Sequence, residues 1–236
     1  MKNCMIYVMS DLHGCYDKYK QMLEKIQFNS NDTLYILGDI VDRGDEGIKI
    51  LLDMMQRSNV VPLLGNHEFM AYSVLKKYNV EITAENYNKH LDSESIEMFE
   101  NWMFNGGIPT CQEFSRLDKS GRNSILEYLE EFELYEELEV NDRKFVLVHG
   151  GLVDFSEDKD LGEYGIHDII WGRCDYEKQY YTDKFLVTGH TPTHNINPDY
   201  KGKIYKEKNH IAIDCGTVFG GRLGCICLDT LEEFYI

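Results

Sequence analysis

Basic side chains are scarce in this 236-residue chain, in which 24 lysines and arginines stand against 41 aspartates and glutamates, for a formal net charge of −17. Long-range repulsion between such a chain and another polyanion excludes nucleic acid and anionic membranes as expected partners. No apolar run approaches the roughly 18 residues that a membrane-spanning helix needs. Proline is also rare, with four residues, and no repeat or low-complexity tract marks a linker. We therefore expect a single domain over residues 1–236.

The cysteines lack the even number and regular spacing of a disulfide framework, since there are seven of them at irregular intervals. The first residues turn acidic too early for a signal peptide. We therefore expect a reduced, cytoplasmic protein. In the pair Cys225 and Cys227, both thiols would lie on one face of a strand. That pair is either a zinc or redox site or, as we favour, two small buried hydrophobic residues.

Short apolar runs alternate with amphipathic helical patterns along the chain. Strands are predicted at residues 5–9, 33–37, 60–64, 144–148 and 184–188, and β-hairpins at 211–228. Helices are predicted at 19–26 and 48–55, followed by a helical segment at about 70–135. We interpret the acidic run Glu127–Glu139 as a solvated helix face. This order of elements indicates an α/β (α+β) fold.

Polar side chains follow the apolar strands at the points where the strands end. They are Asp11, His13, Asp39, Asn66, His149 and His190. Because ligands of α/β sheets bind beyond the carboxyl ends of the strands, these side chains should converge. Carboxylate, amide and imidazole donors suit Mn²⁺, Fe²⁺ or Zn²⁺, and this set is too large for one tetrahedral zinc. The sequence therefore predicts two divalent metal ions that share a carboxylate and bind a phosphoryl group.

Four further side chains fit catalysis on a phosphate. His67, which follows Asn66, could protonate a leaving oxygen. Asp42 could hold the imidazole of His67 in one tautomer and raise its pKa. Arg43 and Arg173 could bind phosphate oxygens bidentately.

Five short motifs hold most of these residues. They are Asp11-Leu12-His13-Gly14, Gly38-Asp39-Ile40-Val41-Asp42-Arg43-Gly44, Gly65-Asn66-His67-Glu68, His149-Gly150-Gly151 and Gly189-His190-Thr191-Pro192. In order and spacing they resemble the signature blocks of the PPP-type metallophosphoesterases, the serine/threonine protein phosphatases. Trp171-Gly172-Arg173 and the segment 218–223 are similar to motifs of the bacterial and phage lambda-like branch. Five blocks in one order are far more specific than any one of them alone.

The resemblance implies a calcineurin-like metallophosphoesterase fold, a central β-sandwich flanked by helices, and two divalent metal ions. Mn²⁺ is the metal typical of bacterial members, with Fe or Zn as alternatives. The first metal would be held by Asp11, His13 and Asp39, and the second by Asp39, Asn66, His149 and His190. His67 would be the general acid with Asp42 as its partner, while Arg43, Arg173 and Asn66 would bind the phosphate.

The function that the resemblance implies first is hydrolysis of phosphoserine or phosphothreonine in proteins, by direct attack of a metal-bridging hydroxide. The alternative is a dinucleoside polyphosphate hydrolase, because symmetrical diadenosine tetraphosphatases resemble the same blocks. That branch typically has Ala in place of Asp42 and Asp in place of Glu68. A catalytically silent phosphate- or metal-sensing module is a third reading, which the complete ligand set disfavours. The substrate would be a phosphorylated protein or a small phosphoester, and regulatory subunits are not indicated.

Overall fold

The structure, a computed structural model that describes residues 4–81, 83, 85, 86 and 92–236, contains two five-stranded β-sheets. The first has the strand order β10-β9-β1-β2-β3 and the second β4-β5-β6-β8-β7. The strands of the first sheet are β1 (Ile6–Met9), β2 (Thr33–Ile36), β3 (Val60–Pro62), β9 (Gly224–Cys227) and β10 (Glu233–Tyr235). Those of the second are β4 (Tyr135–Val140), β5 (Arg143–Val148), β6 (Lys184–Thr188), β7 (Tyr205–Glu207) and β8 (His210–Ala212).

Both sheets are mixed: the second has a parallel centre and two antiparallel edges, whereas the first has one antiparallel edge, β10, and one parallel edge, β3. Strands β1, β2 and β3 run parallel in one sheet, as do β5, β6 and β8 in the other. Strands β9, β10, β4 and β7 pair antiparallel with their neighbours. The carboxyl ends of the parallel strands within each sheet therefore lie at the same edge, where functional loops are expected.

The two sheets pack face to face through side chains that alternate along each strand. In β1, Val8 points into the core shared by the sheets, whereas Tyr7 and Met9 pack on the helix-covered side. In β5, Phe145 and Leu147 belong to the shared core, and Val146 and Val148 face the other way. This period of two is the expected signature of a strand buried on both faces.

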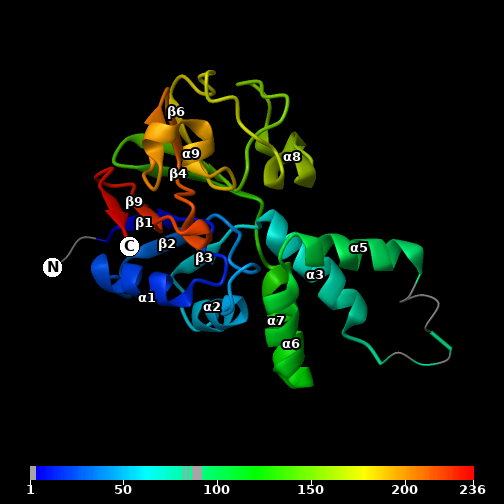
Figure 1. The fold of residues 1–236 in the computed structure, drawn as a ribbon. Helices are drawn as coiled ribbons and strands as arrows, with labels where there is room; N and C mark the ends of the chain where they lie inside the picture. Colours follow the sequence, from blue (N-terminus) through cyan, green and yellow to red (C-terminus); the bar gives the residue numbers. More distant parts are fainter. Residues whose placement is uncertain (1–3, 82, 84, 87–91) are drawn as a thin grey trace.

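Helices cover the outer faces of this sandwich (Figure 1). They are α1 (Tyr16–Lys25), α2 (Gly47–Met54), α3 (Asn66–Tyr78), α5 (Ser93–Phe104), α6 (Ile108–Arg116), α7 (Lys119–Glu130), α8 (Ile166–Ile170) and α9 (Thr193–Ile196). Short 3₁₀ turns occur at η1 (Leu161–Glu163), η2 (Pro198–Tyr200) and η3 (Thr217–Phe219). Helices α3, α5, α6 and α7 lie together at one side, on the right in Figure 1. Among the described residues, no helix combines the length and apolarity needed to cross a bilayer.

The structure confirms the predicted sandwich flanked by helices, and the five predicted strands agree within two residues at either end. The hairpins predicted within 211–228 are wrong in their pairing. Strand β8 pairs with β7 and β6, while β9 pairs with β1 and β10 in the other sheet. The prediction failed because glycine breaks mark the ends of strands without saying which sheet each strand joins.

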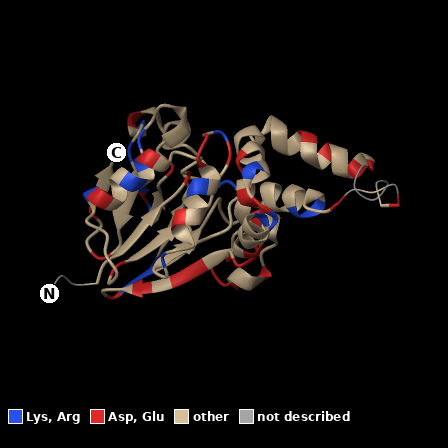
Figure 2. Cartoon of the chain, turned by 90° about the horizontal axis from the view of Figure 1, so that it is seen from below, with Lys and Arg blue, Asp and Glu red and all other residues tan. Residues whose placement is uncertain are grey.

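The acidic run Glu127–Glu139 is a single helix face only in its first part, which corrects the prediction. Helix α7 ends at Glu130, and the later residues form β4, an edge strand. Glu137 and Glu139 are exposed there, as alternation along a strand requires. Charge on an edge strand opposes pairing with another chain. Figure 2 shows acidic residues distributed over both helices and strands.

The two cysteines are buried hydrophobic residues, the alternative that we favoured over a zinc or redox site. Cys225 and Cys227 are both buried on the helix-covered side of the first sheet, opposite Met9 and Tyr7 of β1. Burial raises the pKa of the Cys225 thiol, so it stays protonated and apolar.

Candidate functional site

The predicted ligand residues meet where the loops that follow the parallel strands of both sheets come together. Asp11 and His13 follow β1, Asp39 follows β2, Asn66 begins α3 after β3, His149 follows β5, and His190 follows β6. His149 Nε2 lies 3.3 Å from Asp39 Oδ1, which joins the second sheet to the first. The backbone N–H of His190 donates to Asp11 Oδ2 at 3.0 Å, which joins them a second time.

Two groups of possible metal ligands share one carboxylate, that of Asp39. In the described part of the chain, His13, Asp39 and His67 form one group, and Asp39, His149 and His190 form the other, each with ligand atoms within 4.8 Å of one another. A carboxylate common to both groups is the arrangement that a bridging ligand between two ions requires.

Two imidazoles of this cluster are oriented by backbone carbonyls. His13 Nδ1 lies 2.9 Å from the carbonyl oxygen of Val41, and His149 Nδ1 lies 2.5 Å from that of Leu37. A ring that donates from Nδ1 leaves the Nε2 lone pair free for a metal ion. Burial lowers the pKa of both rings well below the usual value for histidine. Both are therefore neutral, as metal ligation demands.

The carboxylates are buried together, which is costly unless cations neutralise them. Burial raises the pKa of Asp39, and the nearby Asp11 raises it further. Burial also raises the pKa of Asp11, with Asp214 acting in the same direction. Nitrogen and oxygen donors with buried negative charge suit divalent cations of the Mn²⁺, Fe²⁺ and Zn²⁺ type. The residues present therefore fit a binuclear metal centre.

His67 and Asp42 form the predicted pair, with His67 Nδ1 2.7 Å from Asp42 Oδ2. The indole Nε1 of Trp102 donates to the same carboxylate oxygen at 2.9 Å, so this buried tryptophan both packs in the core and supports the pair. The predicted rise in the pKa of His67 is wrong in direction. Burial, with the guanidinium of Arg43 second, lowers that pKa to about 3, because both disfavour the charged imidazolium.

Arg43 and Arg173 line one cavity of about 220 Å³ together with Asp39, Asn66 and His190. The guanidinium of Arg43 contacts His13 Nε2 and donates from Nη2 to His67 Nε2 at 2.9 Å. Arg173 follows α8, and its Nη1 donates to the hydroxyl of Thr191 at 3.1 Å. Both cations thus face the proposed metal ligands, and the cavity suits an anionic group.

Sequence reasoning missed the role of Glu68, which it treated only as part of a motif. The carboxylate is fully buried and accepts four backbone hydrogen bonds. The donors are the N–H groups of Asp39 at 2.7 Å, Ile40 at 2.7 Å, Val41 at 3.1 Å and Gly65 at 3.1 Å. Glu68 therefore fixes the loop that carries Asp39, Asp42 and Arg43.

Asp214 is a second missed residue. It is buried, lines the same cavity, and accepts from the N–H of Gly216 at 2.9 Å. Burial raises its pKa to about 6. The sequence could have indicated Asp214, because it follows the short apolar strand β8 just as the predicted ligands follow their strands.

Left-handed backbone conformations are concentrated in the site. Six of the predicted site residues have positive φ between 41° and 71°: Asp11, His13, Asp39, Asp42, Arg43 and His190. Such conformations cost about 1–3 kcal/mol each and persist only where the surroundings impose them. Because these conformations occur at the predicted site, contacts elsewhere in the fold must offset their cost.

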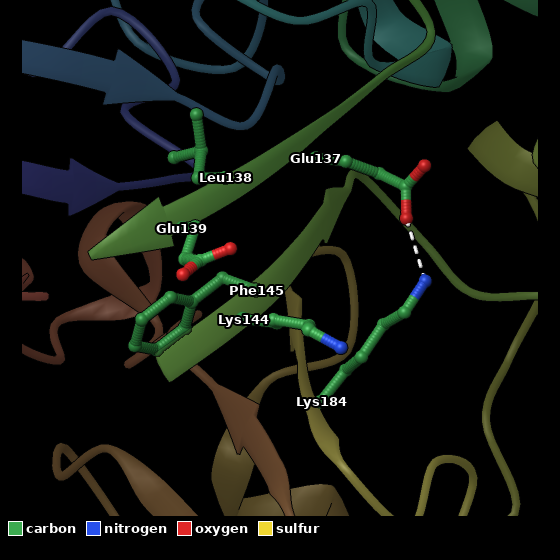
Figure 3. A pocket seen from close by; sticks show the side chains of 6 residues that line it. All are labelled: Glu137, Leu138, Glu139, Lys144, Phe145 and Lys184. Atoms are coloured by element: carbon green, nitrogen blue, oxygen red, sulfur yellow. Dashed lines mark hydrogen bonds and ion pairs between the residues drawn. The ribbon is translucent and has the colours of Figure 1, made fainter. Parts of the chain in front are cut away.

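A second hollow lies at the opposite ends of β5 and β6 (Figure 3). Lys144 and Lys184 stand near the starts of these strands, whereas His149 and His190 come after their ends. Lys184 Nζ pairs with Glu137 at 2.8 Å, and Lys144 Nζ pairs with Asp183 at 2.8 Å. Because these charges are neutralised locally, the hollow offers no chemistry comparable to that of the His/Asp cluster.

The fold and the site together define a metal-dependent phosphoesterase. Residues 5–216 match the model of the calcineurin-like phosphoesterases. The chain belongs to that family.

Two kinds of curated relatives are similar to this chain. It is 25% identical, over 92% of its length and 86% of the relative, to the asymmetrical bis(5'-nucleosyl)-tetraphosphatase PrpE of Oceanobacillus iheyensis. It is 33% identical over 102 residues to the symmetrical bis(5'-nucleosyl)-tetraphosphatase of Wigglesworthia glossinidia brevipalpis. That second match covers 41% of this chain and spans only 36% of the relative's length.

Solved structures support the fold. A candidate diadenosine tetraphosphatase superposes with a TM-score of 0.65 at 15% identity, covering 99% of this chain and 93% of that one. A cold-active protein-tyrosine phosphatase of a Shewanella species superposes with a TM-score of 0.56 at 16% identity, covering 99% and 80%. At these identities the likeness concerns the fold alone.

Proposed function

We propose that this phosphoesterase hydrolyses dinucleoside tetraphosphates, the function that ranked as the alternative from the sequence. The observation that carries the proposal is the similarity to PrpE along 92% of the chain. That match extends over both halves of the site, whereas the match to the symmetrical enzyme covers 41% of the chain. Asp42 and Glu68 also differ from the Ala and Asp expected of the symmetrical branch.

The charge of the cavity supports a substrate with several phosphates. Arg43 and Arg173 line it beside Asp39 and His190. Two bound divalent ions would neutralise phosphate oxygens and activate the attacking water. In addition, α3 begins at Asn66, so its dipole favours an anion there. A polyphosphate chain has more charge to satisfy these groups than a monoester has.

The chain's own residues would divide the reaction as follows. Arg43 and Arg173 bind the oxygens of the phosphate under attack and stabilise the charge that develops on them. His67 would act as general acid from Nε2 once its ring is protonated in the complex with substrate, with Asp42 orienting the ring from Nδ1. Asp11, His13 and Asp39 would hold one ion, and Asp39, Asn66, His149 and His190 the other, with Mn²⁺ as the expected metal. We place all these residues in one catalytic domain spanning 1–236.

The experiment that tests this function is product analysis of diadenosine tetraphosphate hydrolysis with Mn²⁺. Adding one water across an asymmetrical P–O–P bond gives AMP and ATP, whereas a central cut gives two ADP. We expect AMP and ATP, and we expect Asp39→Asn to abolish the reaction. Glu127→Gln, on the exposed face of α7, is the control and should leave the reaction intact. Hydrolysis no faster than that of Asp39→Asn would overturn the proposal.

A protein phosphatase that acts on phosphoserine and phosphothreonine is the second candidate, and the contact between His67 and Asp42 favours it. A serine alkoxide is a poor leaving group and needs protonation, whereas a nucleotide phosphate does not. The two candidates are separated by comparing kcat/KM for diadenosine tetraphosphate with that for phosphoserine and phosphotyrosine peptides. A higher value for the phosphoserine peptide would reverse our ranking.

A further inference from the structure

Phe219 is a large aromatic side chain that stays exposed beside the proposed phosphate site. It is 62% exposed and lines the same cavity as Arg43, Asp39 and Asn66. The guanidinium carbon of Arg43 lies 5.2 Å from the centre of the Phe219 ring, within range of a cation–π contact. A phenylalanine gains by burial, so an exposed ring at the mouth of a charged cavity has no explanation in packing.

The turn that carries Phe219 is fixed in place. Gly216 and Gly220 flank it with φ of 77° and 79°, conformations that favour glycine. The ammonium group of Lys18 donates to the carbonyl oxygens of Thr217 at 2.8 Å and Gly221 at 2.9 Å. The ring is therefore presented on a preorganised turn, which reduces the entropy lost when a ligand binds.

We infer that Phe219 stacks on a nucleobase of the substrate while Arg43 binds the phosphate next to that nucleoside. The inference rests on the proposed function, since a dinucleotide offers both groups in one molecule. With Arg43 over one face of the ring, a planar base can cover the other. Every base has a π-face, so stacking tolerates different nucleosides. Phe219 would thus favour nucleotides over simple phosphoesters.

The test compares two ligands that share a ribose and a 5'-phosphate but differ in the base. Isothermal titration calorimetry of the Mn²⁺-loaded protein gives Kd for AMP and for ribose 5-phosphate. We expect AMP to bind about tenfold or more tightly, in the range that base–aromatic stacking supports. Phe219→Ala should bring the ratio of the two Kd values close to one, and Phe219→Trp should restore it. Taking the ratio cancels any effect of the substitution on the phosphate end.

Phe104→Ala is the matched control. Phe104 is 91% exposed at the end of α5 and is not among the residues that line the cavity, so the ratio should stay at its original value. Equal Kd values in the unmodified protein, or a ratio that survives Phe219→Ala, would overturn the inference. So would an effect of Phe219→Ala confined to phosphopeptide hydrolysis, because the ring would then bind a peptide side chain.

The inference and the proposed function fail separately in these experiments. Diadenosine tetraphosphate left intact, with the base-dependent ratio present and lost in Phe219→Ala, would refute the hydrolase and retain the base site. Hydrolysis of the dinucleotide with a ratio near one would retain the hydrolase and refute the base site.

Discussion

Glu68→Gln tests the idea that one buried carboxylate holds the loop that carries Asp39. The two oxygens of Glu68 divide four N–H donors between them: Oε1 accepts from Ile40 and Val41, and Oε2 from Asp39 and Gly65. Glutamine keeps one oxygen and replaces the other by an NH₂ group, which cannot accept. Two buried N–H groups must then lose their acceptor while the shape of the side chain hardly changes.

The expected magnitude follows from those two donors. A buried N–H group without a partner costs about 1–3 kcal/mol, so the substitution should lower the free energy of unfolding by about 2–6 kcal/mol. Burial raises the pKa of Glu68 to about 7, so above that pH the remaining hydrogen bonds also weaken, because a neutral acceptor replaces a charged one. Since Asp39 is the proposed ligand shared by both metals, displacement of its loop should weaken Mn²⁺ binding as well. Glu68→Asp, which is one methylene shorter, should lose contacts in the same loop.

Urea unfolding and calorimetric titration with Mn²⁺ measure the two effects. Glu127→Gln makes the same chemical change on the exposed face of α7 and should alter stability by less than about 0.5 kcal/mol. The reasoning is refuted if Glu68→Gln unfolds within about 1 kcal/mol of the unmodified protein and binds Mn²⁺ equally well. In that case the loop must be held by its other contacts.

Three further predictions concern the metals, the leaving group and pH. Mn²⁺ at about 100 times its Kd should stabilise the fold by about 2.7 kcal/mol, and chelator or Asp39→Asn should remove that gain in melting temperature; an unchanged melting temperature would argue against the metal centre. His67→Asn should slow hydrolysis of a phosphoserine peptide by about 10²- to 10⁴-fold but that of p-nitrophenyl phosphate far less, and equal losses would refute the general-acid role. Burial lowers the pKa of His210 to about 4. Above about pH 6.5 this ring is neutral in both the folded and the unfolded chain, whereas below that pH the unfolded chain binds a proton there first. The free energy of unfolding should therefore fall by about 3 kcal/mol as the pH drops from about 6.5 to about 4. Urea unfolding between these pH values should show a shallower decline in His210→Gln, and parallel declines would contradict this.

The sequence predicted the convergence of the site because one geometric rule covers it. Asp39 and His149 follow apolar strands of different sheets; within each sheet the carboxyl ends of the parallel strands meet at one edge, and the packing of the two sheets brings these edges together. The rule applies even when it is not known which strand belongs to which sheet. The pairing of β8 and β9 could therefore be predicted wrongly without affecting the expectation that the residues after the other strands converge.

Electrostatic detail could not be read from the sequence in the same way. The family resemblance implies that Asp42 is the partner of His67, and the contact exists at 2.7 Å. The direction of the pKa change depends instead on how much water the surrounding helices exclude, which is a property of the whole fold. The role of Glu68 was hidden for a related reason, because its partners are backbone N–H groups that leave no trace in residue types.

The helical segment after residue 70 also accepts backbone hydrogen bonds from the loop that follows β2. In the loop after β2, Glu68 satisfies the first three N–H groups from Asp39 onward. The N–H of Asp42 donates instead to Thr110 Oγ1 at 2.8 Å, and that of Arg43 donates to the carbonyl oxygen of Gly106 at 2.8 Å. Asp42 and Arg43 both have left-handed backbone conformations, which persist only where their surroundings impose them. This helical segment thus supplies the contacts that hold the proposed phosphate ligand and the partner of the proposed acid, so substitutions around Gly106 and Thr110 should act on catalysis without touching the substrate.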